Sequence, residues 1–255
     1  GQLIRIDGDA EVLTDAQGAQ MAVLGQAVPV VAALLERVDK KDPAWTAVEV
    51  SEAKVRWKAE SDAERPGIVA ICDGLRAVLP DDAMIYSDMT QFAYVAKEVW
   101  PMQRPGHWHL PSGFGTLGYA LPAGIGGAVA RMGRPTVVII GDYGLQYTLP
   151  ELGVAVELGL PLPIILWDNG KLKEIEDSMV GAQIPPNAVV ARNPDFVSVA
   201  QAYGAHAVRP GTLADAQDAL LAALTAKGPT VIHMTTEMQV NSSSRNPPPT
   251  QTLCI

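Results

Sequence analysis

The chain has 255 residues, of which 48% are hydrophobic and 18% are charged, and its formal net charge is −9. This composition excludes a disordered chain and predicts one large core, or one core with an appendage. The acidic balance argues against nucleic acid and membrane surfaces as partners, and the widely separated Cys72 and Cys254 argue against a zinc site, so we expect a cytoplasmic protein.

The first 64 residues divide into two parts. Leu3 to Asp7 alternates in the manner of a strand, a polar turn region follows, and Val28 to Val38 carries the periodicity of a helix. Residues 41–64 are rich in Lys, Asp, Glu and Ala, which is typical of a linker that carries one helix. We therefore predict a separate unit at residues 1–40 and a linker at residues 41–64 that leads into the next domain.

From residue 65 onward, strand-like and helix-like segments alternate. The predicted strands are residues 83–88, 137–140, 163–167, 207–208 and 230–234. The predicted helices are residues 66–79, 90–100, 119–132, 149–158, 196–203 and 213–226, with a further helix after 167. This alternation predicts an α/β fold, a doubly wound parallel sheet with helices on both faces. We place this domain at residues 65–238 and interpret the polar residues 239–255 as a flexible tail.

Two of these strands are followed by oxygen-bearing side chains. Asp142 comes after the strand 137–140, and Asn169 comes after the strand 163–167. Ligands of parallel sheets bind beyond the carboxyl ends of the strands, where these two residues fall. A carboxylate and a carboxamide oxygen there suit a hard divalent cation that holds a diphosphate. Taken alone, however, the run Gly141 to Gly144 is equally typical of an ordinary turn between strand and helix.

Ordered segments around this pair carry a family resemblance. The run Gly141 to Gly144, followed by Trp167 to Lys171, resembles the cofactor signature of thiamine diphosphate enzymes, a Gly-Asp-Gly followed by an Asn pair. Pro111 to Gly126 and Asn193 to Ala205 are similar to stretches on either side of that signature in the acetolactate synthase and 2-oxo acid decarboxylase branch. The resemblance implies that residues 65–238 are the diphosphate-binding domain and that residues 1–40 are the C-terminal remnant of a central domain.

The resemblance implies a Mg²⁺ site that anchors thiamine diphosphate. Asp142 and Asn169 would be side-chain ligands and Lys171 would supply a main-chain carbonyl, with diphosphate oxygens completing the octahedron that Mg²⁺ prefers. Further positions beside the cofactor would be Thr90, Gln91, Gly141, Tyr143 and Gly144. For Thr90 and Gln91 the alternative is a plain helix N-terminus with no contact to a ligand.

The resemblance also implies catalytic positions in the turn from Gly115 to Leu117. Leu117 corresponds to the bulky apolar residue that bends the cofactor, so that the thiazolium C2 approaches the 4′-amino group. The carbonyl of Gly115 and the N–H of Leu117 would hydrogen-bond the aminopyrimidine, and Thr116 between them belongs to the same cofactor-binding turn. The alternative is a core leucine in a glycine-rich turn.

Three positions depart from the family pattern. Tyr143 stands where the family has the second Gly, and Asp168 stands where it has the first Asn, which adds a negative charge near the metal. Leu172 begins a stretch that lacks the family's usual Tyr-Gly. The Arg-Gln-Trp run expected of acetolactate synthases is replaced by Glu174 to Met179. These differences weaken acetolactate synthesis as the specific activity.

The function implied by the resemblance is that of a lyase or transferase. The chain would be the Mg²⁺- and thiamine diphosphate-binding portion of a 2-oxo acid decarboxylase or carboligase, which breaks or forms C–C bonds through a cofactor ylide. Family members take the activating glutamate from a pyrimidine-binding domain of the same or a partner chain, and we expect no such domain within residues 1–255. We therefore expect a homodimer or homotetramer, and an inactive chain in isolation. The alternative is a non-catalytic assembly or binding module with a degenerate cofactor pocket.

Overall fold

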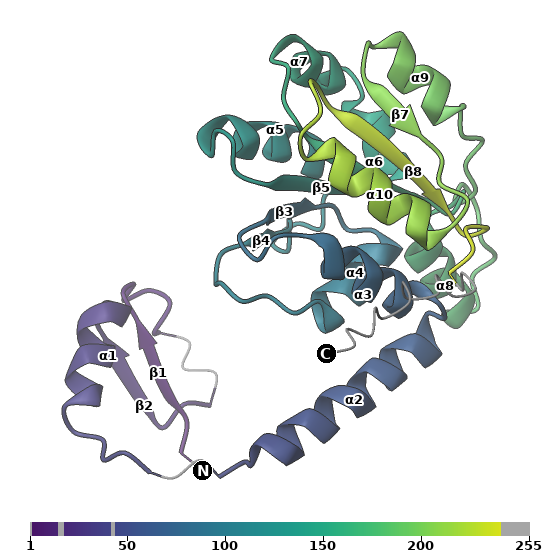
Figure 1. Ribbon diagram of the computed structural model, residues 1–255. Coiled ribbons are helices and arrows are strands. Elements are labelled where there is room, and N and C mark those ends of the chain that lie inside the picture. The colour runs from purple at the N-terminus through teal and green to yellow at the C-terminus, as the bar shows by residue number, and fades with distance from the viewer. Residues whose placement is uncertain (1, 15–17, 42–43, 241–255) are drawn as a thin grey trace, which may run out of the picture. The chain divides into compact units, whose positions relative to one another are not determined.

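The computed structural model describes residues 2–14, 18–41 and 44–240. The chain forms two compact units, Gly1–Glu52 and Ala53–Ile255 (Figure 1). The boundary between them falls inside helix α2 (Ala47–Glu64), which occupies most of the predicted linker. Of the predicted tail, all but residues 239 and 240 lies outside the described residues.

The first unit is a small α/β element. Strands β1 (Ile4–Asp7) and β2 (Met21–Leu24) pair in parallel, with Ile4 opposite Met21, and helix α1 (Ala27–Leu35) follows. The predicted strand and helix are confirmed. Strand β2 was not predicted, because four apolar residues carry no periodicity that separates a strand from a helix. None of the described residues of this unit is buried.

The second unit is built on a parallel sheet. Within the described residues it has six strands in the order β4-β3-β5-β6-β8-β7, and every neighbouring pair is parallel. The strands are β3 (Met84–Ser87), β4 (Trp108–His109), β5 (Thr136–Gly141), β6 (Pro163–Asp168), β7 (His206–Val208) and β8 (Thr230–Thr235). Strands β5, β6 and β8 are buried up to their last residue, as their uninterrupted apolar runs predict.

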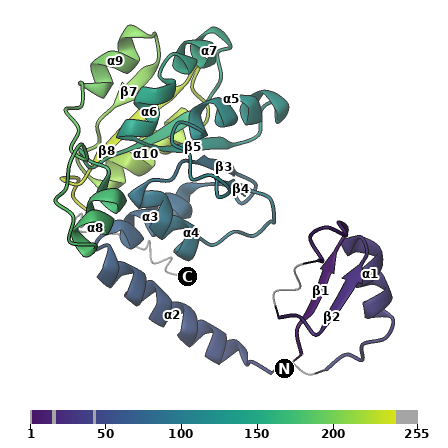
Figure 2. The same ribbon diagram turned by 180° about the vertical axis from the view of Figure 1, so that it is seen from behind.

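Helices cover both faces of this sheet. Helices α3 (Ile68–Val78), α4 (Gln91–Val99) and α10 (Leu213–Ala223) pack with Ile139, Ile165 and Ile232 on one face (Figure 1). Helices α5 (Ala120–Ala130), α7 (Glu151–Glu157) and α9 (Phe196–Ala202) pack on the other, against the alternate residues Val138, Ile140 and Val231 (Figure 2). The alternation follows from the two-residue period of a strand. The predicted doubly wound α/β fold is therefore confirmed.

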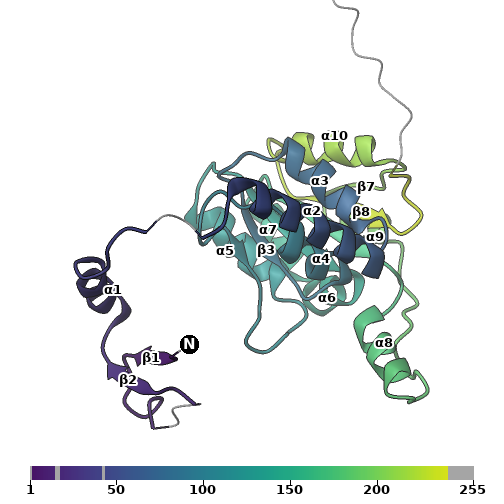
Figure 3. The same cartoon turned by 90° about the horizontal axis from the view of Figure 1, so that it is seen from below.

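Two elements beside the carboxyl ends of the strands differ from the prediction. A helix, α6 (Asp142–Thr148), begins directly at the end of β5, where the sequence predicted a helix only from residue 149. Strand β4 has only two residues and lies in a stretch rich in Gly and Pro, from Pro105 to Gly115, for which the sequence predicted no strand. Helix α8 (Lys173–Gly181) projects from the unit, and its residues, all of them described, are partly or fully exposed (Figure 3).

Candidate functional site

The two predicted ligands lie at the ends of neighbouring strands. Gly141 of β5 pairs with Trp167 of β6 in parallel register, so Asp142 and Asn169 follow the same edge of the sheet. A pocket of about 210 Å³ opens at this edge. It is lined by Met89, Thr90, Gln91, Tyr94, Gly115, Leu117, Gly141, Asp142, Tyr143, Gly144, Trp167, Asn169, Lys171, Leu172, Lys173, Glu174 and Ile175. Of the site residues predicted from the sequence, Thr116 is exposed and does not line the pocket.

The turn that carries Leu117 is bracketed by two glycines in the left-handed region. Gly115 has φ +63° and Gly118 has φ +85°, values that residues with a Cβ rarely adopt. This backbone presents the half-buried Leu117 side chain to the pocket. The predicted glycine-rich turn is therefore present, with a leucine at its pocket side and not in the core.

Asp88, which the sequence analysis missed, holds this turn. The N–H of Gly118 donates to its Oδ2 at 2.6 Å, and the N–H of Ala120 donates to its Oδ1 at 2.7 Å. Burial raises the pKa of Asp88, while the hydrogen bonds from the main chain act in the opposite direction. Its position after a buried strand, like that of Asp142, was the signal available in the sequence.

Asp142 is a buried carboxylate with no cationic partner among the described residues. It is 4% exposed, and its Oδ2 accepts a hydrogen bond from Asn193 Nδ2 at 2.7 Å. Burial raises its pKa most strongly, and the nearby negative charge of Asp168 raises it further. A charged group in this position is expected to be compensated by a cation or to take up a proton.

The amide of Asn169 has a defined orientation. Its Nδ2 donates to Gln91 Oε1 at 3.1 Å, and the indole N–H of Trp167 donates to the same oxygen at 3.2 Å. Because an indole nitrogen can only donate, Gln91 must present its oxygen, and Asn169 must present its nitrogen to Gln91. Asn169 Oδ1 accepts from the N–H of Lys171 at 3.2 Å, while the Lys171 ammonium pairs with Glu176 at 3.0 Å.

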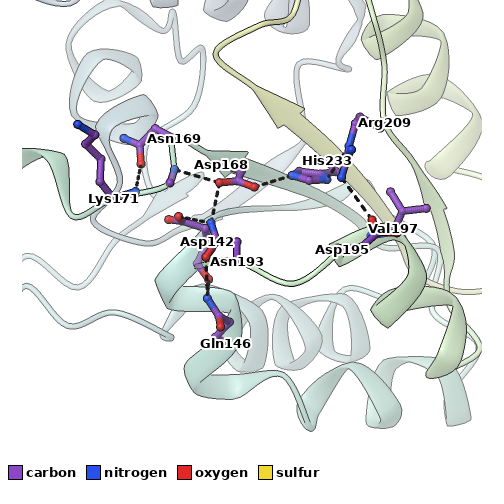
Figure 4. Close-up of polar contacts among 11 residues, drawn as sticks. Asp142, Gln146, Asp168, Asn169, Lys171, Asn193, Asp195, Val197, Arg209 and His233 are labelled. Atoms are coloured by element: carbon purple, nitrogen blue, oxygen red, sulfur yellow. Dashed lines mark hydrogen bonds and ion pairs between the residues drawn. The ribbon is translucent and has the colours of Figure 1, made fainter. Parts of the chain in front are cut away.

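The hydrogen-bond partners of Asp168 lie outside the predicted ligand set. Its Oδ2 lies 2.8 Å from His233 Nε2, and its Oδ1 accepts from Asn193 Nδ2 at 2.8 Å (Figure 4). Burial is the largest single influence on its pKa and acts upward, but the hydrogen bonds from His233, Asn193 and Gly170 outweigh burial and lower it. The extra negative charge expected near the metal is thus stabilised by partners of its own.

The oxygen donors that the predicted ligands offer are of the chemical type that Mg²⁺ prefers. Asp142 offers a buried carboxylate without a counter-ion, Asn169 an amide oxygen and Lys171 a main-chain carbonyl, which are the hard donors that Mg²⁺ prefers. The described residues contain no group of three or more His, Cys, Asp and Glu that could hold a metal ion, so a cation here would need this mixed set of oxygens.

A second pocket of about 390 Å³ adjoins the first and shares part of its wall with it. The two pockets have Gln91, Trp167, Lys173 and Glu174 in common. Glu174 is held by both nitrogens of a fork from Arg65, at 3.1 Å and 3.0 Å. The Glu174 carboxylate is therefore engaged in a bidentate ion pair with Arg65.

The fold and the site define a parallel α/β domain with an oxygen-lined pocket at its strand ends. Residues 88–234, more than half of the chain, match the family described as "Thiamine pyrophosphate enzyme, C-terminal TPP binding domain". The chain belongs to this family, as the resemblance implied. Among the described helices, none combines the length and the apolar character required to cross a membrane.

Relatives of known name support this membership. The chain is 38% identical over 237 residues to the "Probable 2-ketoarginine decarboxylase AruI" of Pseudomonas aeruginosa, covering 92% of this chain and 42% of that protein. It is 26% identical over 214 residues to the acetolactate synthase isozyme 3 large subunit of Escherichia coli, covering 79% and 37% respectively. The chain thus spans less than half the length of these relatives.

Solved structures share the fold. The benzoylformate decarboxylase of Polynucleobacter necessarius superposes with a TM-score of 0.74 at 18% identity, over 95% of this chain and 45% of that one. The thiamine diphosphate-dependent 4-hydroxybenzoylformate decarboxylase of Rhodococcus jostii RHA1 gives a TM-score of 0.71 at 22% identity, over 94% and 45%. At these identities the similarity concerns the fold alone.

Proposed function

We propose that the chain is the Mg²⁺- and thiamine diphosphate-binding portion of a 2-oxo acid decarboxylase or carboligase. The observation that carries this proposal is the buried Asp142 carboxylate, which has no cationic partner among the described residues and faces the same pocket as Asn169. Asp142, Asn169 and the carbonyl of Lys171 would hold the cation, and the cation would hold the diphosphate.

The remaining pocket residues would orient the cofactor. Leu117 would lie between its two rings, with the main chain of Gly115 and Leu117 at the aminopyrimidine edge and Thr116 on the outer side of the turn. Thr90, Gln91, Gly141, Tyr143 and Gly144 would surround the diphosphate. When bound, thiamine diphosphate supplies the nucleophilic carbon and the electron sink for loss of CO₂.

Decarboxylation is favoured over acetolactate synthesis. The stretch Glu174 to Met179 lacks the Arg-Gln-Trp run expected of the synthases, and the relative with 38% identity is named as a decarboxylase. Its name makes 2-ketoarginine the first substrate to test. Because the activating glutamate is expected from a pyrimidine-binding domain, we expect turnover only with such a domain, in a homodimer or homotetramer.

The alternative is an assembly module with a degenerate pocket, suggested by Tyr143, Asp168 and Leu172. Two observations count against it. Asp168 is stabilised by partners outside the predicted ligand set, and the predicted ligands face a common pocket. In a pocket that binds no cation, the buried Asp142 carboxylate would lower the stability of the fold, since an unpaired buried charge is costly.

Calorimetric titration distinguishes the two functions. Thiamine diphosphate is titrated into the 255-residue chain with and without Mg²⁺, and into the Asp142→Asn variant, which keeps the side-chain volume but loses the charge. We expect Mg²⁺-dependent binding that the variant loses, because the cation loses its only anionic protein ligand. Absence of binding by the unaltered chain, even with a pyrimidine-binding domain added, would favour the assembly module.

A further inference from the structure

We propose that Asn193 is the positioning residue of the cation-binding carboxylate Asp142, and that Asp168, His233 and Arg209 hold Asn193 in place. The inference rests on the proposed function, because it assigns these residues a role toward the Mg²⁺ site. It also gives a role to Asp168, which stands where the family has an asparagine. Figure 4 shows the residues concerned.

Asn193 lies between two carboxylates. Its Nδ2 donates to Asp142 Oδ2 at 2.7 Å and to Asp168 Oδ1 at 2.8 Å, which uses both hydrogens of the amide nitrogen. Its Oδ1 accepts from Gln146 Nε2 at 3.1 Å. Both the nitrogen and the oxygen of the Asn193 amide are therefore hydrogen-bonded. The bond to Asp142 Oδ2 fixes the orientation of the Asp142 carboxylate (Figure 4). A metal ligand fixed in this manner needs no reorientation when the cation binds.

The tautomer of His233 follows from its neighbours. Arg209 Nε lies 3.1 Å from His233 Nδ1, and a guanidinium can donate but not accept. Nδ1 must therefore accept, which places the ring hydrogen on Nε2, where it is donated to Asp168 Oδ2 at 2.8 Å. Arg209 is itself held by Asp195 at 3.3 Å. The side chain of His233 is 2% exposed, so its ring is shielded from water, whereas Arg209 and Asp195 are 52% and 56% exposed.

A carboxylate at residue 168 is what this network requires. Its Oδ1 accepts from Asn193 and from the N–H of Gly170, and its Oδ2 accepts from His233. An asparagine here would place its NH₂ group at one of these two positions. At the Oδ2 position the group would meet the N–H of His233, and at the Oδ1 position it would meet the N–H groups of Asn193 and Gly170. Since two donors cannot pair, an asparagine would leave a buried polar group unsatisfied. Asp168, His233 and Asn193 thus form one interdependent set.

The test measures by calorimetry how thiamine diphosphate binding to the 255-residue chain depends on the Mg²⁺ concentration, which yields an apparent Mg²⁺ affinity. Asn193→Ala is expected to weaken Mg²⁺ binding by about 10- to 100-fold, the usual effect of losing a residue that orients a metal ligand. Asn187→Ala is the matched control, since Asn187 is exposed in the same loop, and it should leave the affinity unchanged. Thermal unfolding without Mg²⁺ shows for each variant that the fold is retained.

A pair of His233 variants tests the supporting chain. His233→Phe removes the donor to Asp168 and should weaken Mg²⁺ binding, whereas His233→Gln can donate to Asp168, accept from Arg209 and restore it. Unchanged affinity in Asn193→Ala, or equal losses in the two His233 variants, would overturn the proposal. If His233→Phe does not fold, the Mg²⁺ affinities of Asn193→Ala and His233→Gln decide: the proposal requires a loss in the first and none in the second. A chain with unaltered sequence that binds no cofactor with Mg²⁺, even with a pyrimidine-binding domain added, overturns the proposed function itself, and the inference with it.

Discussion

At the scale of single residues, three aspartates at three adjacent strand ends have three different environments. Asp88 after β3 accepts main-chain N–H groups, Asp142 after β5 accepts from an amide, and Asp168 at the end of β6 accepts from a histidine. The pKa is raised by burial at Asp88 and Asp142, and lowered at Asp168 because its hydrogen bonds outweigh burial. The partner, more than the side chain itself, decides the role of each carboxylate.

At Gly144 the surrounding atoms leave no room for a side chain. A Cβ at this position would lie 2.0 Å from Asp88 Oδ2 and 3.2 Å from Ile140 Cγ1. Asp88 is fully buried and held by two main-chain N–H groups, so it cannot give way. We expect Gly144→Ala to lower the free energy of unfolding by about 1–3 kcal/mol, the usual cost of overpacking, as measured by urea denaturation.

Gly126 provides the matched control for this substitution. It also lies in a helix, α5, but a Cβ there would meet nothing within 4 Å. Gly126→Ala should therefore be neutral, or stabilising by up to about 1 kcal/mol, because alanine favours the helix. Equal behaviour of the two variants would mean that Asp88 is not held as the structure has it.

At the scale of elements, helix α4 begins at the pocket. Thr90 is its N-cap, and Thr90 Oγ1 accepts from the N–H of Ala93 at 3.1 Å. The sequence left two roles open for Thr90, a plain helix cap or a contact with the cofactor. The structure confirms the cap and places Thr90 in the wall of the pocket, so the two roles are compatible.

Capping and cofactor contact can be separated by comparing two helices. Thr212 caps α10 in the same manner, its own N–H donates in return to Asp215 Oδ2 at 3.1 Å, and it does not line the pocket. Thr90→Ala and Thr212→Ala should each lower the free energy of unfolding by about 1 kcal/mol. Only Thr90→Ala should also weaken thiamine diphosphate binding in calorimetry. Equal affinities in the two variants would leave Thr90 with a capping role alone.

At the scale of the whole molecule, the two units differ in what stabilises them. The second unit has buried clusters on both faces of its sheet. In the first unit none of the described residues is buried, and apolar side chains such as Val28, at 81%, and Leu35, at 74%, are exposed. Because helices in proteins are stabilised mainly by packing, the first unit has little to hold it folded by itself.

Limited proteolysis tests this difference. Under native conditions we expect cleavage first within residues 1–52, leaving a resistant fragment that begins in α2 and whose thermal unfolding midpoint equals that of the intact chain. Mass spectrometry of the fragments identifies the cut positions. A resistant fragment that retains both β1 and β8 would contradict the expectation.

Much of the second unit could be predicted from the sequence. Strands β5, β6 and β8 are continuous apolar runs, and the neighbouring positions of Asp142 and Asn169 follow from the rule that ligands bind at the carboxyl ends of parallel strands. Strands β2 and β4 were missed because they are short and their pairing partners lie elsewhere in the chain. The run Gly141 to Gly144 was recognised as the passage from strand to helix, but the extent of α6 was not predicted because residues 142–148 carry no apolar period.

By itself, the sequence determined the fold class and the family, and it indicated a cation site at Asp142 and Asn169, because these depend on local pattern and on the order of segments. Only the tertiary structure decided how the pair is supported. Asn193 reaches Asp142 across 51 residues, and His233 reaches Asp168 across 65. Hydrogen bonds between positions so far apart leave no periodic signal, since they arise only when the sheet brings its strand ends together.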